Sequence, residues 1–220
     1  MYIEYRGFTM DVKLRNRLIN IAKNNIHNDL SHDFSHAYRV LVSAEKIGKK
    51  EGADMDILVP AALFHDVRVY KGTRMHRYEH EESSDFAKKT LETLGYQKDK
   101  INNVAYAISV CSFSKNIKAE TLEAKILQDA DLLEAEGAIA IMRTFASAVS
   151  MHLKSFYNMN DPFCRKRAPN EKIYALDHFY SRLLIADTRL NTKTAKRMAN
   201  RKKRFLIEFL KELELELSST

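Results

Sequence analysis

Apolar residues recur three and four positions apart along most of the chain, which is the pattern of amphipathic helices. Near the N-terminus, for example, Leu14, Leu18 and Ile21 follow this spacing. The pattern predicts helices over the ranges 9–25, 33–51, 55–66, 79–94, 100–112, 119–136, 139–156, 173–187 and 192–217. The stretch 157–171 holds two prolines and a basic cluster, which predicts a surface loop. The chain is therefore predicted to be all-α.

The composition agrees with long helices joined by short loops. Six Gly and three Pro among 220 residues leave few helix breakers, and 45% hydrophobic residues suffice for one full-sized core. Because no internal repeat or linker is found, a single domain over 1–220 is predicted. The net charge of +7 favours anionic partners. Two widely spaced cysteines and the lack of a leader or membrane-spanning run predict a cytoplasmic protein.

The most informative local feature is the pair His65-Asp66, which directly follows an almost wholly apolar run. Two ionisable side chains at the end of a buried segment are costly unless they bind partners or a metal. Imidazole and carboxylate ligands suit a divalent first-row cation. The candidates for further ligands are His36, on the apolar stripe of the second predicted helix, and either Asp129 or Asp131. Acids two positions apart point to nearly opposite sides of a helix, so only one of them is expected to face a shared site.

Three longer blocks surround these residues in the same order. They are Ser-His-Asp-Phe-Ser-His-Ala-Tyr-Arg-Val at 31–40, Ala-Ala-Leu-Phe-His-Asp at 61–66 and Gln-Asp-Ala-Asp-Leu-Leu-Glu-Ala-Glu-Gly-Ala-Ile at 128–139. Together they resemble the HD-domain superfamily of metal-dependent phosphohydrolases, and segments 177–184 and 191–196 are similar to its bacterial branch of stand-alone enzymes acting on nucleotides. The resemblance covers about 12–215. It implies a helical bundle with core blocks at about 31–140 and C-terminal helices at about 171–217.

The resemblance implies that His36, His65, Asp66 and Asp131 hold one divalent metal ion. It thereby selects Asp131 and leaves Asp129 as a neighbour of the ligands. Two imidazoles and two carboxylates without a thiolate admit Mn, Fe, Mg, Co, Ni or Zn, among which Mn or Fe is favoured. The alternative is that the four ionisable groups merely pair with one another and bind no metal.

The residues expected to handle protons are Asp66, His80 and Glu81, because relatives often place a His or an acid after the HD pair within reach of the metal-bound water. Acids in a first helical turn also interact favourably with the helix dipole, so a structural role is the alternative. Arg143, which lies among apolar neighbours, and Lys71, in the basic stretch after the HD pair, are the candidates for phosphate binding.

A second His-Asp pair, His32-Asp33, stands in the polar entry to a helix. The resemblance implies that both residues line the substrate pocket, and helix capping by Asp33 is the structural alternative. Relatives often carry a His where Cys111 stands here, so the resemblance leaves a second metal open.

The implied reaction is hydrolysis of a phosphoester or phosphoanhydride bond, with a small phosphorylated substrate, first of all a nucleotide. The alternative is a non-catalytic metal-containing module that binds an anionic ligand or RNA. The basic run 201–204 lies in a highly charged helix without interleaved aromatic residues, so nucleic acid is not expected as a partner. No membrane partner is expected either.

Overall fold

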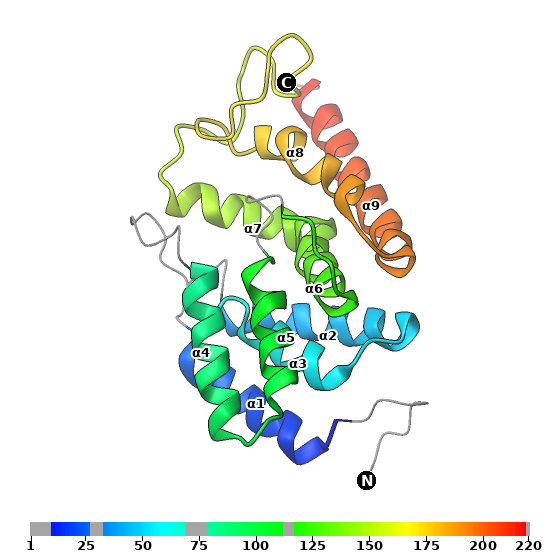
Figure 1. Ribbon diagram of the computed structural model, residues 1–220. Coiled ribbons are helices and arrows are strands. Elements are labelled where there is room, and N and C mark those ends of the chain that lie inside the picture. The colour runs from blue at the N-terminus through cyan, green and yellow to red at the C-terminus, as the bar shows by residue number, and fades with distance from the viewer. Residues whose placement is uncertain (1–9, 27–32, 69–78, 112–116, 219–220) are drawn as a thin grey trace. The chain divides into compact units, whose positions relative to one another are not determined.

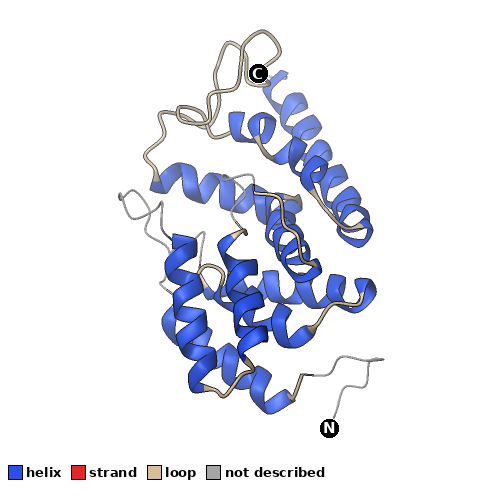
Figure 2. Ribbon diagram, viewed as in Figure 1, coloured by secondary structure: helices blue, strands red, loops and turns tan. Residues whose placement is uncertain are grey.

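The structure is a computed structural model that describes residues 10–26, 33–68, 79–111 and 117–218. Within these ranges all regular elements are helices, and the only strand-like pairing is an isolated bridge between Ser155 and Tyr174 (Figure 2). The predicted all-α fold is thus confirmed. The chain divides into two compact units, Met1–Asp131 and Leu132–Thr220, each described by itself here. The single domain over 1–220 stays a prediction.

The first unit is built around one apolar helix (Figure 1). Its helices are α1 (Val12–Asn25), α2 (Phe34–Glu51), α3 (Met55–Phe64), α4 (Glu79–Thr93), α5 (Lys98–Ser109) and α6 (Leu122–Leu132). Helix α3 packs against α1, α2, α4 and α5, and every residue from Ile57 to Phe64 is buried. A helix that is apolar on all sides needs neighbours on all sides. The packing therefore carries the C-terminal end of α3, and with it His65, into the interior.

Both ends of α2 are fixed by local chemistry. Asp33 is its N-cap, and its Oδ1 accepts a hydrogen bond from the backbone N–H of His36 at 2.9 Å. At the other end Gly52 adopts a left-handed conformation with φ 82°, which a residue without Cβ enters at little cost. The predicted capping role of Asp33 is confirmed. Because the cap closes on His36 itself, it also fixes the backbone of the first turn.

Helix α3 begins at Met55, as predicted, and ends two residues before the predicted end at residue 66. Asp54 caps the helix by accepting a hydrogen bond from the N–H of Asp56 at 2.9 Å, so Pro60 lies inside the helix and does not start it. The helix ends at Phe64, with His65 as its C-cap. The HD pair therefore belongs to the turn that follows the helix.

The second unit has its own apolar core. Its elements are η2 (Leu133–Ala135), α7 (Gly137–Ser150), α8 (Asp177–Ser181), η3 (Leu183–Arg189) and α9 (Lys193–Ser218). The buried residues of the core are Ala140, Leu176, Phe179, Leu183, Leu206 and Leu210. They come from α7, α9 and the segment around α8, so these elements form one hydrophobic cluster.

Several helix boundaries near and within this unit differ from those that the apolar periodicity predicts. The helix predicted over 119–136 gives way to η2 after Leu132, because Gly137 has φ 76° and turns the chain into α7. A Cβ added to Gly137 would lie 3.2 Å from Cβ of Lys202, so α9 packs closely here. The helix predicted over 139–156 ends at Ser150, shortly before His152, which has φ 53°.

The segment between α7 and α8 is irregular, as predicted, but a buried ion pair holds it in place. Asp177 is fully buried and accepts two hydrogen bonds from the guanidinium of Arg167, at 2.5 and 2.7 Å, and one from the N–H of Asn170 at 2.6 Å. A bidentate pair of this kind fixes direction as well as distance. Arg167, part of the basic cluster, therefore anchors the loop to α8.

Candidate metal centre

Four ionisable side chains that are far apart in the sequence meet in the first unit. His36 comes from the first turn of α2, His65 and Asp66 from the turn after α3, and Asp131 from the last turn of α6. The Nε2 atom of His36 lies 3.5 Å from Oδ2 of Asp66 and 3.4 Å from Oδ1 of Asp131. The corresponding distances from Nε2 of His65 are 3.5 and 3.9 Å. The structure thus brings together the four residues predicted as metal ligands.

The spacing of these atoms fits a shared cation. Ligand atoms about 2.1 Å from a metal ion lie about 3 Å apart when they are at right angles and about 4.2 Å apart on opposite sides. The distances between the imidazole nitrogens and the carboxylate oxygens fall between these limits. One ligand atom each from His36, His65 and Asp131 lies within 4.8 Å of the others. Asp66 is not part of this mutually close group, although its Oδ2 lies 3.5 Å from both imidazole nitrogens.

A hydrogen bond orients the ring of His65 toward the cluster. Nδ1 of His65 lies 2.8 Å from the carbonyl oxygen of Ala62, which can only accept, so this nitrogen carries the hydrogen. Nε2 of His65 is 3.3 Å from Nε2 of His36, and both face the two carboxylates. Two imidazole nitrogens and two carboxylates that face one another are stabilised by a proton or a metal ion among them.

One side of the cluster is buried and the other is open. The side chains of His36 and His65 are each 1% exposed, whereas those of Asp66 and Asp131 are 16% and 27% exposed. Burial raises the pKa of Asp131, but the hydrogen bond from His36 and the charges of His65 and His36 lower it by more, so the net shift is downward. Asp131 is therefore a carboxylate at neutral pH, on the side where solvent or a substrate can reach the cluster.

Cys111 is buried close to this centre. Burial raises the pKa of its thiol well above the ordinary value, and the carboxylates of Asp131 and Asp66 raise it further. The thiol is therefore neutral, and Cys111 does not belong to the group of convergent ligand atoms found among the described residues. Asp129 is fully buried and makes contacts of its own, while Asp131 joins the cluster, as the helical offset of two residues requires.

The turn after the HD pair is tied to the start of α4, a link that the sequence alone did not indicate. The hydroxyl of Ser83 accepts a hydrogen bond from the N–H of Arg68 at 3.1 Å, and the guanidinium of Arg68 lies 4.9 Å from the ring centre of Phe86. His80 and Glu81 belong to the first turn of this helix. The contact therefore supports their placement near the residues that follow Asp66.

Among the remaining predicted site residues, the contact to the cluster that the structure describes is the hydrogen bond from the N–H of His36 to Asp33. Lys71 and His32 lie outside the described residues. Asp33 serves as the cap of α2. Arg143 lies on α7 in the second unit and is half-buried. Their roles in substrate binding stay predictions.

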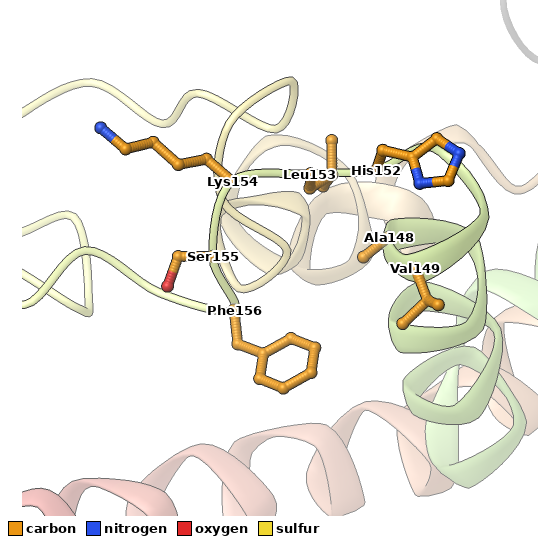
Figure 3. Close-up of a pocket in the computed structure, with 7 residues that line it drawn as sticks. All are labelled: Ala148, Val149, His152, Leu153, Lys154, Ser155 and Phe156. Carbon is orange, nitrogen blue, oxygen red and sulfur yellow. The ribbon is translucent and has the colours of Figure 1, made fainter.

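A pocket of about 490 Å³ lies in the second unit, where α7 ends (Figure 3). It is lined by Ala148, Val149, His152, Leu153, Lys154, Ser155 and Phe156. In Figure 3 the polar side chains of His152, Lys154 and Ser155 point in different directions, so they do not converge on one centre. None of the predicted site residues lines it.

Comparison with known proteins identifies the family. The model of the HD domain family matches residues 33–136, the range that contains all four converging side chains. The uncharacterized protein YpgQ of Bacillus subtilis (strain 168) is 32% identical over 190 residues, which cover 84% of each chain. The chain belongs to the HD-domain family.

Solved structures agree with this membership. The crystal structure of Bacillus subtilis YpgQ in complex with ADP matches with a TM-score of 0.72 and 29% identity, covering 92% of this chain and 97% of YpgQ. An HD-superfamily hydrolase from Bacillus thuringiensis matches with a TM-score of 0.72 and 29% identity, over 94% and 98% of the two chains. The Lin1889 protein of Listeria innocua matches with a TM-score of 0.71 and 33% identity, over 96% and 99%.

Membership in this family makes the protein a metal-dependent phosphohydrolase. This outcome favours the enzyme over the non-catalytic module considered from the sequence. HD domains bind divalent metals, and the ligand atoms of His36, His65 and Asp131 could hold such an ion. Among the described residues, none of the helices is long and apolar enough to cross a membrane.

Proposed function

We propose that this HD-domain protein hydrolyses a phosphoester or phosphoanhydride bond of a nucleotide, using one divalent ion held by His36, His65, Asp66 and Asp131. The observation that carries the proposal is that ligand atoms of His36, His65 and Asp131 lie within 4.8 Å of one another, with Oδ2 of Asp66 3.5 Å from both imidazole nitrogens. The structure of YpgQ in complex with ADP supports a nucleotide as the ligand class.

The ion would supply Lewis acidity, lowering the pKa of a water molecule and polarising a phosphoryl oxygen. Backbone groups of the chain fix the orientation of the residues that would bind the ion. The Ala62 carbonyl orients the ring of His65, and the Asp33 cap fixes the turn that carries His36. A ligand oriented by a second hydrogen bond loses less freedom when it binds a metal.

Proton transfer is assigned to Asp66, His80 and Glu81. Asp66 is the partly exposed carboxylate of the cluster that is also adjacent to His65 in sequence. The hydrogen bond between Ser83 and Arg68 supports the nearness of α4 to this turn. A carboxylate or imidazole within hydrogen-bond reach of the attacking water can take up its proton.

The negative charge of the substrate's phosphate groups requires positively charged side chains besides the metal ligands. Arg143 and Lys71 are proposed to bind phosphate oxygens, and His32 and Asp33 to contact the substrate. A guanidinium presents a planar fork that matches two phosphate oxygens. Manganese or iron is the preferred ion, because the donor set contains nitrogen and oxygen but no thiolate.

The test is a metal and substrate screen on the purified protein. Wild-type protein is loaded with Mn²⁺, Fe²⁺, Mg²⁺, Co²⁺, Ni²⁺ or Zn²⁺, and release of phosphate or pyrophosphate is measured from nucleoside tri-, di- and monophosphates and a cyclic nucleotide. Asp131→Asn should lose the metal and the turnover, whereas Asp85→Asn, which removes an exposed carboxylate of the same unit, should keep both. Turnover without any metal dependence, or by Asp131→Asn at the wild-type rate, would refute the proposal.

A further inference from the structure

The second unit contains a cluster of charged side chains organised by one carboxylate. Oε2 of Glu171 accepts hydrogen bonds from Nδ1 of His178 at 3.0 Å and from the hydroxyl of Ser181 at 2.5 Å. Oε1 of the same carboxylate accepts from Nε and Nη2 of Arg182 at 3.1 and 3.0 Å. Glu171 comes from the loop before α8, and the three donors come from α8 and the residue after it. The carboxylate therefore fixes an imidazole and a guanidinium relative to each other.

The hydrogen-bond pattern sets the state of the imidazole. Burial raises the pKa of Glu171, but the hydrogen bonds from Arg182, Ser181 and His178 and the charge of Arg182 bring it down to about 2, so Glu171 is ionised at neutral pH. Because a carboxylate can only accept, the shared hydrogen lies on Nδ1 of His178. Burial lowers the pKa of His178, Glu171 opposes this, and the charges of Arg182 and Arg143 lower it again. The ring is thus neutral at pH 7, with the electron pair on Nε2.

Arg143 brings a further positive charge to the same place. It is half-buried on α7, close enough to act on His178, and among the described residues no carboxylate forms an ion pair with it. The rings of Phe145 and Phe179, 6.2 Å apart, join α7 to α8 beside this cluster. Arg182 is paired with Glu171, whereas Arg143 adds a positive charge that acts on His178. A partly buried cation in this situation favours binding of an anion.

The cluster is accessible to a small ligand. The side chains of Glu171, His178 and Arg182 are 28%, 33% and 41% exposed. We propose that Arg143, His178 and Arg182 form a phosphate-binding subsite in the second unit, held in shape by Glu171. The ligand class of this subsite is a phosphate group, either as inorganic phosphate or as part of a nucleotide. On binding of a phosphate dianion, Nε2 takes a proton from solvent and donates it in a hydrogen bond to a phosphate oxygen.

Two substitutions of one residue separate this role from a structural one. His178→Asn keeps an amide N–H near the position of Nδ1, and so the hydrogen bond to Glu171, but removes Nε2. His178→Gln places an amide N–H near the position of Nε2 instead. Binding of inorganic phosphate and of ADP to the full-length protein is measured by calorimetry, with Lys172→Gln as an exposed control of equal charge loss to Arg143→Gln.

We expect His178→Asn and Arg143→Gln each to weaken binding of phosphate and ADP about tenfold, the loss of one charge-assisted hydrogen bond. His178→Gln should keep more affinity than His178→Asn, and Lys172→Gln should match wild type. If His178→Asn and Arg143→Gln bind both probes like wild type, the subsite is refuted while metal-dependent turnover can still stand. If turnover is absent but both variants lose affinity, the proposed function fails and the subsite stands.

Glu171 is a positioning residue in this proposal. Removing its charge should change the affinity for phosphate in opposite directions, depending on whether Glu171 positions the subsite or only repels the anion. A purely electrostatic surface would bind phosphate more tightly after Glu171→Gln, because a repelling carboxylate is removed. The positioned subsite predicts several-fold weaker binding, since the amide no longer fixes His178 and Arg182. NMR titration of the His178 ring should also show a lower pKa in this variant, because Glu171 raises it. Tighter phosphate binding by Glu171→Gln would overturn the positioning role.

Discussion

Glu136 is a buried acid whose charge should cost stability at neutral pH. Its side chain is 1% exposed, and neither carboxylate oxygen has a partner in hydrogen-bond geometry among the described residues. Burial and the carboxylate of Asp187 raise the pKa of Glu136, the positive charges of Lys203 and Lys202 oppose the shift, and the net result is a pKa of about 7. The group is therefore a candidate for a stabilising substitution in the second unit.

The sign of the pH dependence follows from the two pKa values. In the unfolded chain Glu136 loses its proton near its ordinary pKa of 4.5, whereas the folded protein keeps it up to about 7. The folded state therefore binds more protons between these values, and its stability falls as the pH rises through this window. Each pKa unit corresponds to about 1.4 kcal/mol, so the full cost above pH 7 is up to about 3 kcal/mol.

Glu136→Gln keeps the shape of the side chain and removes the charge. We expect it to raise the free energy of unfolding by about 1 to 3 kcal/mol at pH 8 and to change it little at pH 4. Urea unfolding followed by circular dichroism at both pH values measures the difference. Glu212→Gln, an exposed acid of α9, controls for the loss of one negative charge from a basic protein. An equal gain at both pH values, or a loss at pH 8, would refute the reasoning.

Three further predictions concern the other features of the fold. His65→Ala should lose the bound metal in elemental analysis and lower metal-dependent turnover at least about 100-fold, and full metal content would contradict the assignment. Arg167→Ala leaves the buried Asp177 carboxylate unpaired and should cost about 3 to 5 kcal/mol in urea unfolding, a loss under about 1 kcal/mol being incompatible with the pair's role. Gly137→Ala, at φ 76° and against α9, should lower the free energy of unfolding by about 1 to 3 kcal/mol. The loss should exceed that of Gly95→Ala, where φ is 75° and an added Cβ would have no heavy atom within 4 Å. Equal losses in the two variants would show that packing against α9 is not involved.

Much of the first unit could be predicted from local sequence patterns. The apolar run of α3 required burial on all sides, and Asp33 and Gly52 are residues that cap and end a helix by their own chemistry. The candidate ligands followed from ionisable residues placed in apolar contexts, while the choice between Asp129 and Asp131 came from the family resemblance. In each case the information lies within one turn of the residue or in a recurrent motif.

The amino-acid sequence by itself determined the helical class, most helix positions in the first unit and the family, because periodicity, caps and ordered motifs are properties of the chain. Only the tertiary structure decided that the imidazoles of His36 and His65 lie 3.4 to 3.9 Å from the two carboxylates of the cluster. It also decided that Asp177 is buried against Arg167 and that Glu171 organises the residues around His178. Contacts of this kind join segments that are far apart in the sequence. Hydrophobic spacing indicates only which face of an element is buried, so it does not predict which polar groups will face each other.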